Sequence, residues 1–186
     1  HVYEPRYIAL VEDALAAHRF IGMIQPRWQE EDEETQEALP PLYKVGCVGR
    51  ITSFTERRDG TYAITLSGIA RFRLLRETGL HRGYRLGRVD VSSFANDLHE
   101  LPPSPFDRKK LLEALRAYFK QKGLHARWSV IEQMDDDVLL VTLPMICPFP
   151  PAEKQALLDA ASLTERVRVL QTLLDMAGPE HEGPPS

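Results

Sequence analysis

The first half of the chain alternates between apolar and polar residues, which is the pattern of half-buried β-strands. The apolar positions of the clearest stretch are Tyr62, Ile64 and Leu66 and, after a restart at Gly68, Ala70, Phe72 and Leu74. Segments 43–54 and 84–91 alternate in the same way. Asp59-Gly60 separates the first two segments and suits a tight hairpin, because both residues tolerate positive φ. The pattern predicts an antiparallel meander.

Two further elements precede the meander. Apolar residues at helical spacing predict a helix over residues 4–18, and Pro5 suits its first turn because the missing N–H would be unpaired there. Residues 20–24 form a short apolar run that predicts a strand. We therefore expect five or six strands, joined by short turns. This arrangement favours a barrel or a sandwich over a parallel sheet.

The second half of the chain has helical periodicity. The stiff segment 101–105 contains three prolines and is the predicted domain boundary. Ser104 is the expected N-cap of a helix that Gly123 ends, and helices are also expected over 128–134 and 152–161. Ser162 and Glu165 have capping-box spacing for a last helix over 162–177. Segment 138–146 is apolar nearly all round, so periodicity does not separate helix from strand, and its helical neighbours favour helix. The expected division is a β-rich region 1–101, a helical bundle 102–178 and a mobile tail 179–186.

Composition places the chain among globular proteins of the reducing cytoplasm. Hydrophobic residues make up 43% of its 186 residues, and no run is long and apolar enough for a transmembrane helix. No signal-peptide pattern opens the sequence. Cys47 and Cys147, the two cysteines, each lie in an apolar run, which favours buried thiols over a disulfide. We expect a cytoplasmic protein without a membrane partner.

The charges are unevenly distributed. The net charge of −4 disfavours nucleic acid as a partner. An acidic block covers residues 30–37, whereas six arginines cluster nearby: Arg71, Arg73, Arg76, Arg82, Arg85 and Arg88. The simplest interpretation is a solvated strand face and a solvated loop. Two alternatives remain open, namely a basic patch for RNA and an acidic segment that covers this patch as a regulatory lid.

Motifs for catalysis and cofactor binding are missing from the sequence. The six histidines are scattered without helical i, i+4 spacing, which disfavours a zinc site. The sequence has neither a Gly-x-Ser-x-Gly elbow nor a phosphate-binding glycine-rich loop followed by lysine. We predict no enzymatic activity, no metal and no cofactor. A small-molecule pocket between the β-rich and helical regions remains a minor alternative.

Four motifs in order carry a family resemblance. They are Glu4-Pro5-Arg6-Tyr7 before a helix, Ile21-Gly22-Met23, Val45-Gly46-Cys47-Val48-Gly49-Arg50-Ile51 and Leu66-Ser67-Gly68-Ile69-Ala70-Arg71-Phe72. Over residues 1–177 the chain resembles the N-terminal, substrate-binding domain of Lon proteases, above all stand-alone bacterial proteins that consist of this domain. The resemblance implies an α+β fold: a β-rich PUA-like pseudo-barrel followed by a helical bundle, with one more strand upstream of His1.

The resemblance also implies a function. Full-length Lon proteases add an ATPase module and a Ser–Lys peptidase module, and neither has a counterpart in this sequence. What carries over is recognition of protein substrates or partners, including unfolded polypeptides, without catalysis. Candidate contact residues are Trp28, Tyr43 and Phe54, beside sheet edges that can accept an extended peptide. Glu4, Arg6 and Tyr7 are interpreted as a structural ion-pair motif at a helix start, and no pattern specifies an oligomeric state.

Overall fold

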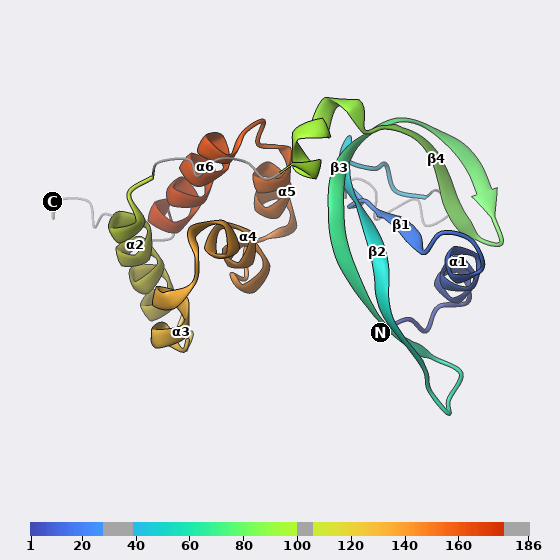
Figure 1. Cartoon of the computed structure of the whole chain (residues 1–186), viewed down its shortest axis with the longest axis horizontal. Coiled ribbons are helices and arrows are strands. Elements are labelled where there is room, and N and C mark those ends of the chain that lie inside the picture. Colours follow the sequence, from blue (N-terminus) through green and yellow to red (C-terminus); the bar gives the residue numbers. More distant parts are fainter. Residues whose placement is uncertain (28–38, 100–105, 177–186) are drawn as a thin grey trace, which may run out of the picture. The chain divides into compact units, whose positions relative to one another are not determined.

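A computed structural model describes residues 1–27, 39–99 and 106–176 of the chain. The chain divides into two compact units, His1–Leu101 and Pro102–Ser186. Each unit has its own apolar core. The α+β class expected from the sequence is confirmed, with the strands in the first unit and a set of helices in the second (Figure 1).

The first unit is built on an antiparallel sheet with strand order β1-β2-β3-β4. Its elements are α1 (Pro5–Ala16), β1 (Phe20–Met23), β2 (Val45–Glu56), β3 (Tyr62–His81), β4 (Tyr84–Asp90) and the 3-10 segment η2 (Ser92–Leu98). The predicted meander is therefore confirmed. The pairing of β1 with β2 continues beyond the strand ends, because Pro26 bridges Leu42.

The described sheet has four strands where five or six were expected, because β3 is one strand of 20 residues. Gly68 pairs with Gly49 and Ala70 with Val48, so Ile69 is an extra residue opposite β2. Such a bulge bends a strand without ending its ladder. The inserted residue also shifts the alternation by one position. The restart after Gly68 in the sequence is therefore a bulge within one strand.

Helix α1 lies against both outer strands, β1 and β4, and so spans the open side of the curved sheet (Figure 1). Val11 and Ala14 from α1 are buried with Ile21 of β1 and Ile51 of β2. Burying these side chains stabilises the closed arrangement, because apolar surface leaves water. The helix and the sheet together form a pseudo-barrel.

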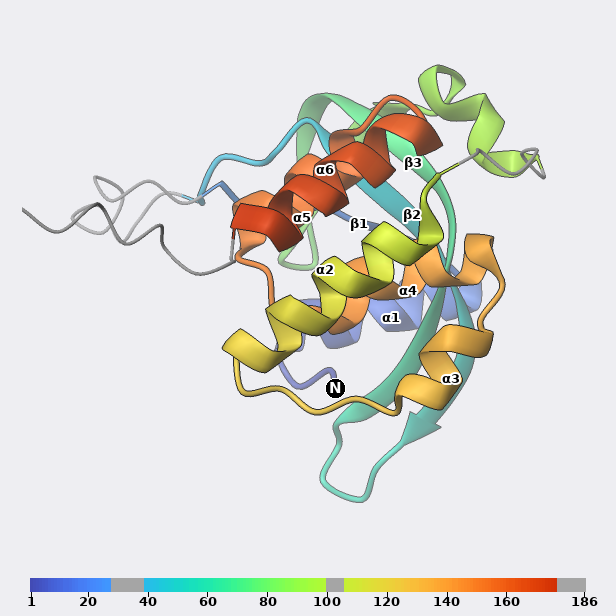
Figure 2. The same cartoon turned by 90° about the vertical axis from the view of Figure 1, so that its left-hand side faces the viewer.

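The second unit consists of helices around a leucine-rich core (Figure 2). They are α2 (Arg108–Gln121), α3 (Trp128–Gln133), α4 (Asp136–Ile146), α5 (Pro151–Asp159) and α6 (Leu163–Met176). The fully buried leucines are Leu111, Leu115, Leu139, Leu140, Leu143, Leu170 and Leu174. They come from α2, α4 and α6, and α2 lies beside α6 in Figure 2. The apolar segment 138–146 is thus a helix, as its neighbours indicated.

Several helix ends follow the sequence signals and one does not. The expected cap Ser104 lies outside the described residues, and α2 begins only at Arg108, where the Asp107 carboxylate accepts a hydrogen bond from the Lys110 N–H at 2.9 Å. The cap is Asp107 rather than Ser104, so the predicted start was too early. Gly123 follows α2 with a φ of +63°, as a helix-ending glycine should.

Candidate functional site

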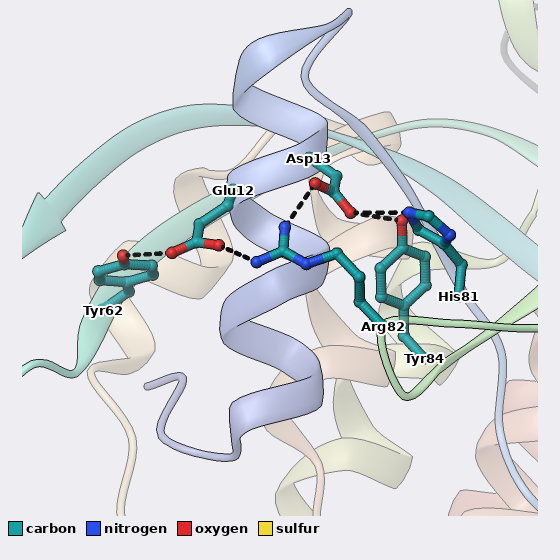
Figure 3. Close-up of polar contacts among 6 residues, drawn as sticks. All are labelled: Glu12, Asp13, Tyr62, His81, Arg82 and Tyr84. Carbon is teal, nitrogen blue, oxygen red and sulfur yellow. Dashed lines mark hydrogen bonds and ion pairs between the residues drawn. The ribbon is translucent and has the colours of Figure 1, made fainter.

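The densest polar cluster of the first unit joins α1 to the β3–β4 hairpin (Figure 3). The hairpin turn consists of Arg82 and Gly83, whose φ values are +47° and +89°. Positive φ at both central residues matches the right-handed twist of two antiparallel strands, and asparagine or glycine is the usual choice. An arginine at the first position is strained, so its side-chain contacts must outweigh that cost.

Arg82 holds the two acidic residues of α1. Its Nη1 donates to Asp13 Oδ1 and its Nη2 to Glu12 Oε2, both at 2.6 Å. Tyr84 Oη donates to the other Asp13 oxygen at 2.8 Å, and Tyr62 Oη donates to Glu12 Oε1 at 3.3 Å. We call Glu12, Asp13, Arg82 and Tyr84 the helix–hairpin clasp.

The clasp sets the charge state of Asp13. The hydrogen bond from Tyr84, together with the Arg82 guanidinium, holds the pKa of Asp13 below its usual 3.8. Desolvation and the neighbouring Asp13 carboxylate raise the pKa of the Tyr84 hydroxyl. Asp13 therefore stays ionised and Tyr84 stays protonated at neutral pH. Each charged group has a partner of opposite charge, so the clasp fits a structural role rather than proton transfer.

The predicted contact aromatics do not form one surface in the described residues. Phe54 is exposed near the end of β2 and meets the Tyr62 ring edge to face, with centroids 5.0 Å apart. Tyr43 is half-buried, and its N–H donates to the Gln25 carbonyl at 3.0 Å. Trp28 lies outside the described residues. Of the two that are described, Phe54 is the more accessible to a partner.

The Glu4-Arg6-Tyr7 motif comes together at the start of α1. Glu4 is the N-cap residue, and its Oε2 accepts a hydrogen bond from Arg6 Nε at 2.8 Å. The Arg6 guanidinium lies 4.6 Å from the centre of the Tyr7 ring. Gly83 of the hairpin turn lies against Arg6, because a Cβ on this glycine would be 3.1 Å from Arg6 Cβ. The motif therefore borders the clasp.

The six candidate arginines divide by their partners. Arg71 is buried, with 8% of its surface exposed, and forms two parallel hydrogen bonds of 2.8 Å with the Asp97 carboxylate of η2. The same carboxylate accepts from the Arg71 backbone N–H at 2.9 Å. This arginine holds η2 against β3. It is a structural residue and not part of an exposed basic patch.

Two other arginines also have carboxylate partners. Arg82 belongs to the clasp, and Arg85 forms a bidentate pair with Glu77 at 2.6 and 2.7 Å. Arg73 lies 5.9 Å from the Phe94 ring centre. Arg76 and Arg88 instead face each other across β3 and β4 as a pair of like charges. In the described residues neither has an ion-pair partner.

Residues 1–27, 39–99 and 106–176 form neither a metal site nor a membrane-spanning helix. In these ranges no three His, Cys, Asp or Glu side chains gather as a metal site would require. No helix in the described parts has the length and apolar character that crossing a bilayer demands. The first unit has main-chain groups at the edges of its sheet that a partner strand could pair with, because β1 and β4 are the outer strands of the described sheet.

Sequence reasoning missed the clasp and the Asp97 anchor. Glu12 and Arg82 are separated by 70 positions, and no local spacing connects them. The signal for the turn was present, because Arg82-Gly83 separates two alternating segments and glycine suits such a position. The partners of Arg71 and Arg82 depend on how α1 and η2 lie against the sheet, which only the tertiary structure shows.

Comparison with known proteins gives one family. The family model described as "ATP-dependent protease La (LON) substrate-binding domain" matches residues 1–176. The curated relatives include Lon protease 2 of Myxococcus xanthus, 26% identical over 170 residues, which cover 90% of this chain and 20% of the relative. Lon protease 2 of Sorangium cellulosum is 27% identical over 190 residues, which cover 94% and 22%. The chain thus spans about a fifth of the length of these relatives.

Solved structures confirm the fold. A Lon N-terminal domain protein from Xanthomonas campestris superposes with a TM-score of 0.57 at 20% identity, covering 96% of this chain and 87% of that one. The N-terminal domain of a Mycobacterium avium complex Lon protease gives 0.58 at 17% identity, covering 94% and 88%. The PUA-like pseudo-barrel with a helical part is therefore the fold of this chain.

Proposed function

The chain belongs to the family of ATP-dependent protease La (LON) substrate-binding domains, and from this premise we propose that it is a non-catalytic module that binds unfolded polypeptides. The family description supplies substrate binding, and the proposal adds the chemical class of the substrate. An unfolded chain presents unpaired main-chain groups and apolar side chains. A surface that recognises it should offer partners for both.

The observation that carries the proposal is the outer strand β4 with its apolar surroundings. Leu75, Leu80 and Leu86 of the β3–β4 hairpin are exposed. A strand edge can accept an extended peptide through main-chain hydrogen bonds, which are independent of the peptide sequence. Exposed leucines next to such an edge can cover the apolar side chains of the added strand. We keep Phe54 of β2 and Tyr43, two residues before β2, as further proposed contact residues.

The test is a binding measurement with one test protein in two states. Lysozyme that has been reduced and carboxymethylated stays unfolded, and fluorescence anisotropy reports its association with the purified chain. We expect micromolar binding of the unfolded form and none of native lysozyme. Absence of association at concentrations up to about 500 µM would contradict the proposal, because a complex with a micromolar dissociation constant would be almost fully formed there.

Three surface variants locate the binding. Leu86→Ser and Phe54→Ala each remove an exposed apolar side chain from the sheet, and each should weaken the association. Val138→Ser is the matched control, since Val138 is similarly exposed but belongs to α4 of the other unit. Equal weakening by all three variants would argue against a site on the sheet.

We further propose that the chain has no catalytic activity of its own and acts in the cytoplasm. Support comes from the family match, which covers nearly the whole chain with a substrate-binding domain. Incubation of the pure chain with ATP or with an unfolded protein should leave both unchanged. Release of phosphate or of peptide fragments in proportion to the chain concentration would refute this part.

A further inference from the structure

The inference concerns Arg76 and Arg88, which pair across β3 and β4. Side chains of directly opposed residues in an antiparallel sheet lie about 4.5–5.5 Å apart at Cβ, and like charges there destabilise the sheet. Both arginines are exposed. Neither has an ion-pair partner within the described part of the chain, whereas Arg71, Arg82 and Arg85 each have one.

The carboxylates closest to the pair along the strands are already engaged. Glu77 follows Arg76 directly, yet its side chain is on the opposite face and holds Arg85. Asp90 is on the same face of β4 as Arg88, but it accepts hydrogen bonds from the Ser92 and Ser93 hydroxyls at 2.6 Å. The positive charge of the pair is thus not neutralised by these acidic neighbours.

The backbone around the pair is irregular. Leu75 and Thr78 are extra residues of β3 opposite β4, so two bulges flank Arg76. Bulges redirect side chains and are over-represented next to functional sites. On β4 the neighbour of Arg88 on the same face is Leu86, and its partner on β3 is Gly79. Because glycine has no side chain, Leu86 is not covered from β3 and remains exposed.

We propose that the β4 edge, with Arg76, Arg88 and Leu86, is a recognition site for an extended polypeptide segment that carries an acidic residue two positions from an apolar one. A strand added to β4 would place alternate side chains on the same face. One of these side chains would lie opposite Arg88, and the next one on that face, two residues along the peptide, would lie opposite Leu86. This inference rests on the proposed function and names the feature of the substrate that is read.

The charge balance favours a polypeptide over RNA. RNA binding draws its affinity from many phosphate contacts. Within the described residues, Arg76 and Arg88 are the two of the six candidate arginines that lack both a carboxylate and an aromatic partner, and the chain has a net charge of −4. A single carboxylate beside Arg88, within the field of both guanidinium groups, is a better match for this arrangement.

The test uses short labelled peptides and the full chain. One peptide carries Glu-Thr-Val and a second Val-Thr-Glu within a threonine background, because the direction of the added strand is open. A third replaces Glu by Lys. We expect one of the Glu peptides to bind more tightly than the Lys peptide by about five- to tenfold, with the difference shrinking at high salt.

Charge reversal of the site gives the decisive comparison. Arg88→Glu should remove the preference for Glu and create one for Lys, whereas Arg58→Glu in the exposed β2–β3 turn should leave the preference unchanged. The thermal midpoint of Arg88→Glu should stay equal or rise, because it removes a repulsion from Arg76. A fall in the midpoint together with an unchanged peptide preference would identify the pair as purely structural and overturn the inference.

Two further outcomes separate this inference from the proposed function. If unfolded lysozyme binds but neither the wild type nor Arg88→Glu distinguishes the Glu peptides from the Lys peptide, the proposed recognition of an acidic residue is wrong. The proposed polypeptide-binding function then stands. If neither lysozyme nor any peptide binds, both are wrong. If a single-stranded RNA oligomer binds more tightly than every peptide and loses binding in Arg88→Glu, the patch serves nucleic acid, and the inference falls.

Discussion

At the scale of residues, the helix–hairpin clasp shows how one strained position is compensated. Arg82 occupies a conformation that favours glycine or asparagine, and its guanidinium reaches two carboxylates of α1 in return. Tyr84, two residues further on at the start of β4, completes the arrangement. The helix and the hairpin are therefore fixed to each other by polar contacts at the surface, next to the apolar contacts of the core.

The first prediction concerns Tyr84 and pH. The Tyr84 hydroxyl lowers the pKa of Asp13, so the ionised carboxylate stabilises the fold. This stabilisation is complete above the usual pKa of 3.8 and is lost as the pH falls through the lowered value. Tyr84→Phe should raise the pKa of Asp13 in an NMR titration. It should also lower the thermal midpoint more at pH 7 than at pH 2.5.

Tyr3→Phe is the control for this prediction, because Tyr3 is exposed and the described hydrogen bonds to Asp13 come from Arg82 and Tyr84. It should leave both the midpoint and the titration of Asp13 unchanged. An Asp13 pKa that is the same in Tyr84→Phe and in the wild type would show that Arg82 alone sets the charge state.

At the scale of elements, the strands depend on close approach as much as on alternation. A Cβ on Gly46 of β2 would lie 2.5 Å from Phe72 Cζ and 2.6 Å from the Met23 carbonyl oxygen. Gly49, in the same strand and equally buried, has its closest neighbour, Leu66 Cβ, at 3.4 Å. The two glycines look alike in the sequence, yet only one is required by its surroundings.

The second prediction follows from this difference. Gly46→Ala should destabilise the chain by at least about 1–3 kcal/mol, the usual range for overpacking, because the ring and the carbonyl must move. Gly49→Ala should cost less than about 1 kcal/mol, since its neighbour is at ordinary contact distance. Urea unfolding of both variants measures the two free energies. Equal losses would mean that β2 adjusts as easily at one position as at the other.

The third prediction concerns the start of α6. Ser162 Oγ accepts a hydrogen bond from the Glu165 N–H at 3.1 Å, and Glu165 Oε2 accepts one from the Ala161 N–H at 2.8 Å. The expected capping box is thus present, with the glutamate reaching one residue further back. Ser162→Ala should cost about 1 kcal/mol in urea unfolding. Ser129→Ala, at an exposed position of α3, should cost much less.

The sequence predicted well those elements whose apolar residues repeat at helical spacing over several turns. Leu111, Leu115, Tyr118 and Phe119 repeat at helical spacing, and all four are buried. Local chemistry also sufficed for the cap of α6. Prediction was less successful at Ile69, where one extra residue shifts the apolar–polar alternation. It was also less successful at the start of α2, where more than one residue can cap the helix. The pairing of Arg76 with Arg88 depends on two bulges and could not be derived from the sequence.

At the scale of the whole molecule, the two units have separate cores, and we propose that they unfold separately. The fourth prediction tests this with hydrogen exchange on the full chain. Leu115→Ala removes a fully buried side chain from the helical core and should cost about 2–5 kcal/mol. Amides of α2, α4 and α6 should lose protection, while those of β2 and β3 should keep theirs.

Ile51→Ala provides the reciprocal variant, because Ile51 is buried in the core of the first unit. The amides of β2 and β3 should then lose protection from hydrogen exchange, while those of α2, α4 and α6 should keep theirs. If either variant lowers protection equally across both units, the chain unfolds as one cooperative body. The division at residues 101 and 102 would then have no energetic meaning.

The long strand β3 has one more consequence. Arg73 pairs both with Val45 of β2 and with Asp90 of β4, so the two ladders that β3 forms meet at this residue. Inserting a single amino acid beside Arg73 would turn the inward-facing side chains of one hairpin outward. The side chains of the other hairpin would keep their places. The same insertion in the β2–β3 turn, around Asp59, would only lengthen a loop. A library of single insertions should therefore be depleted sharply around Arg73 and stay well populated around Asp59.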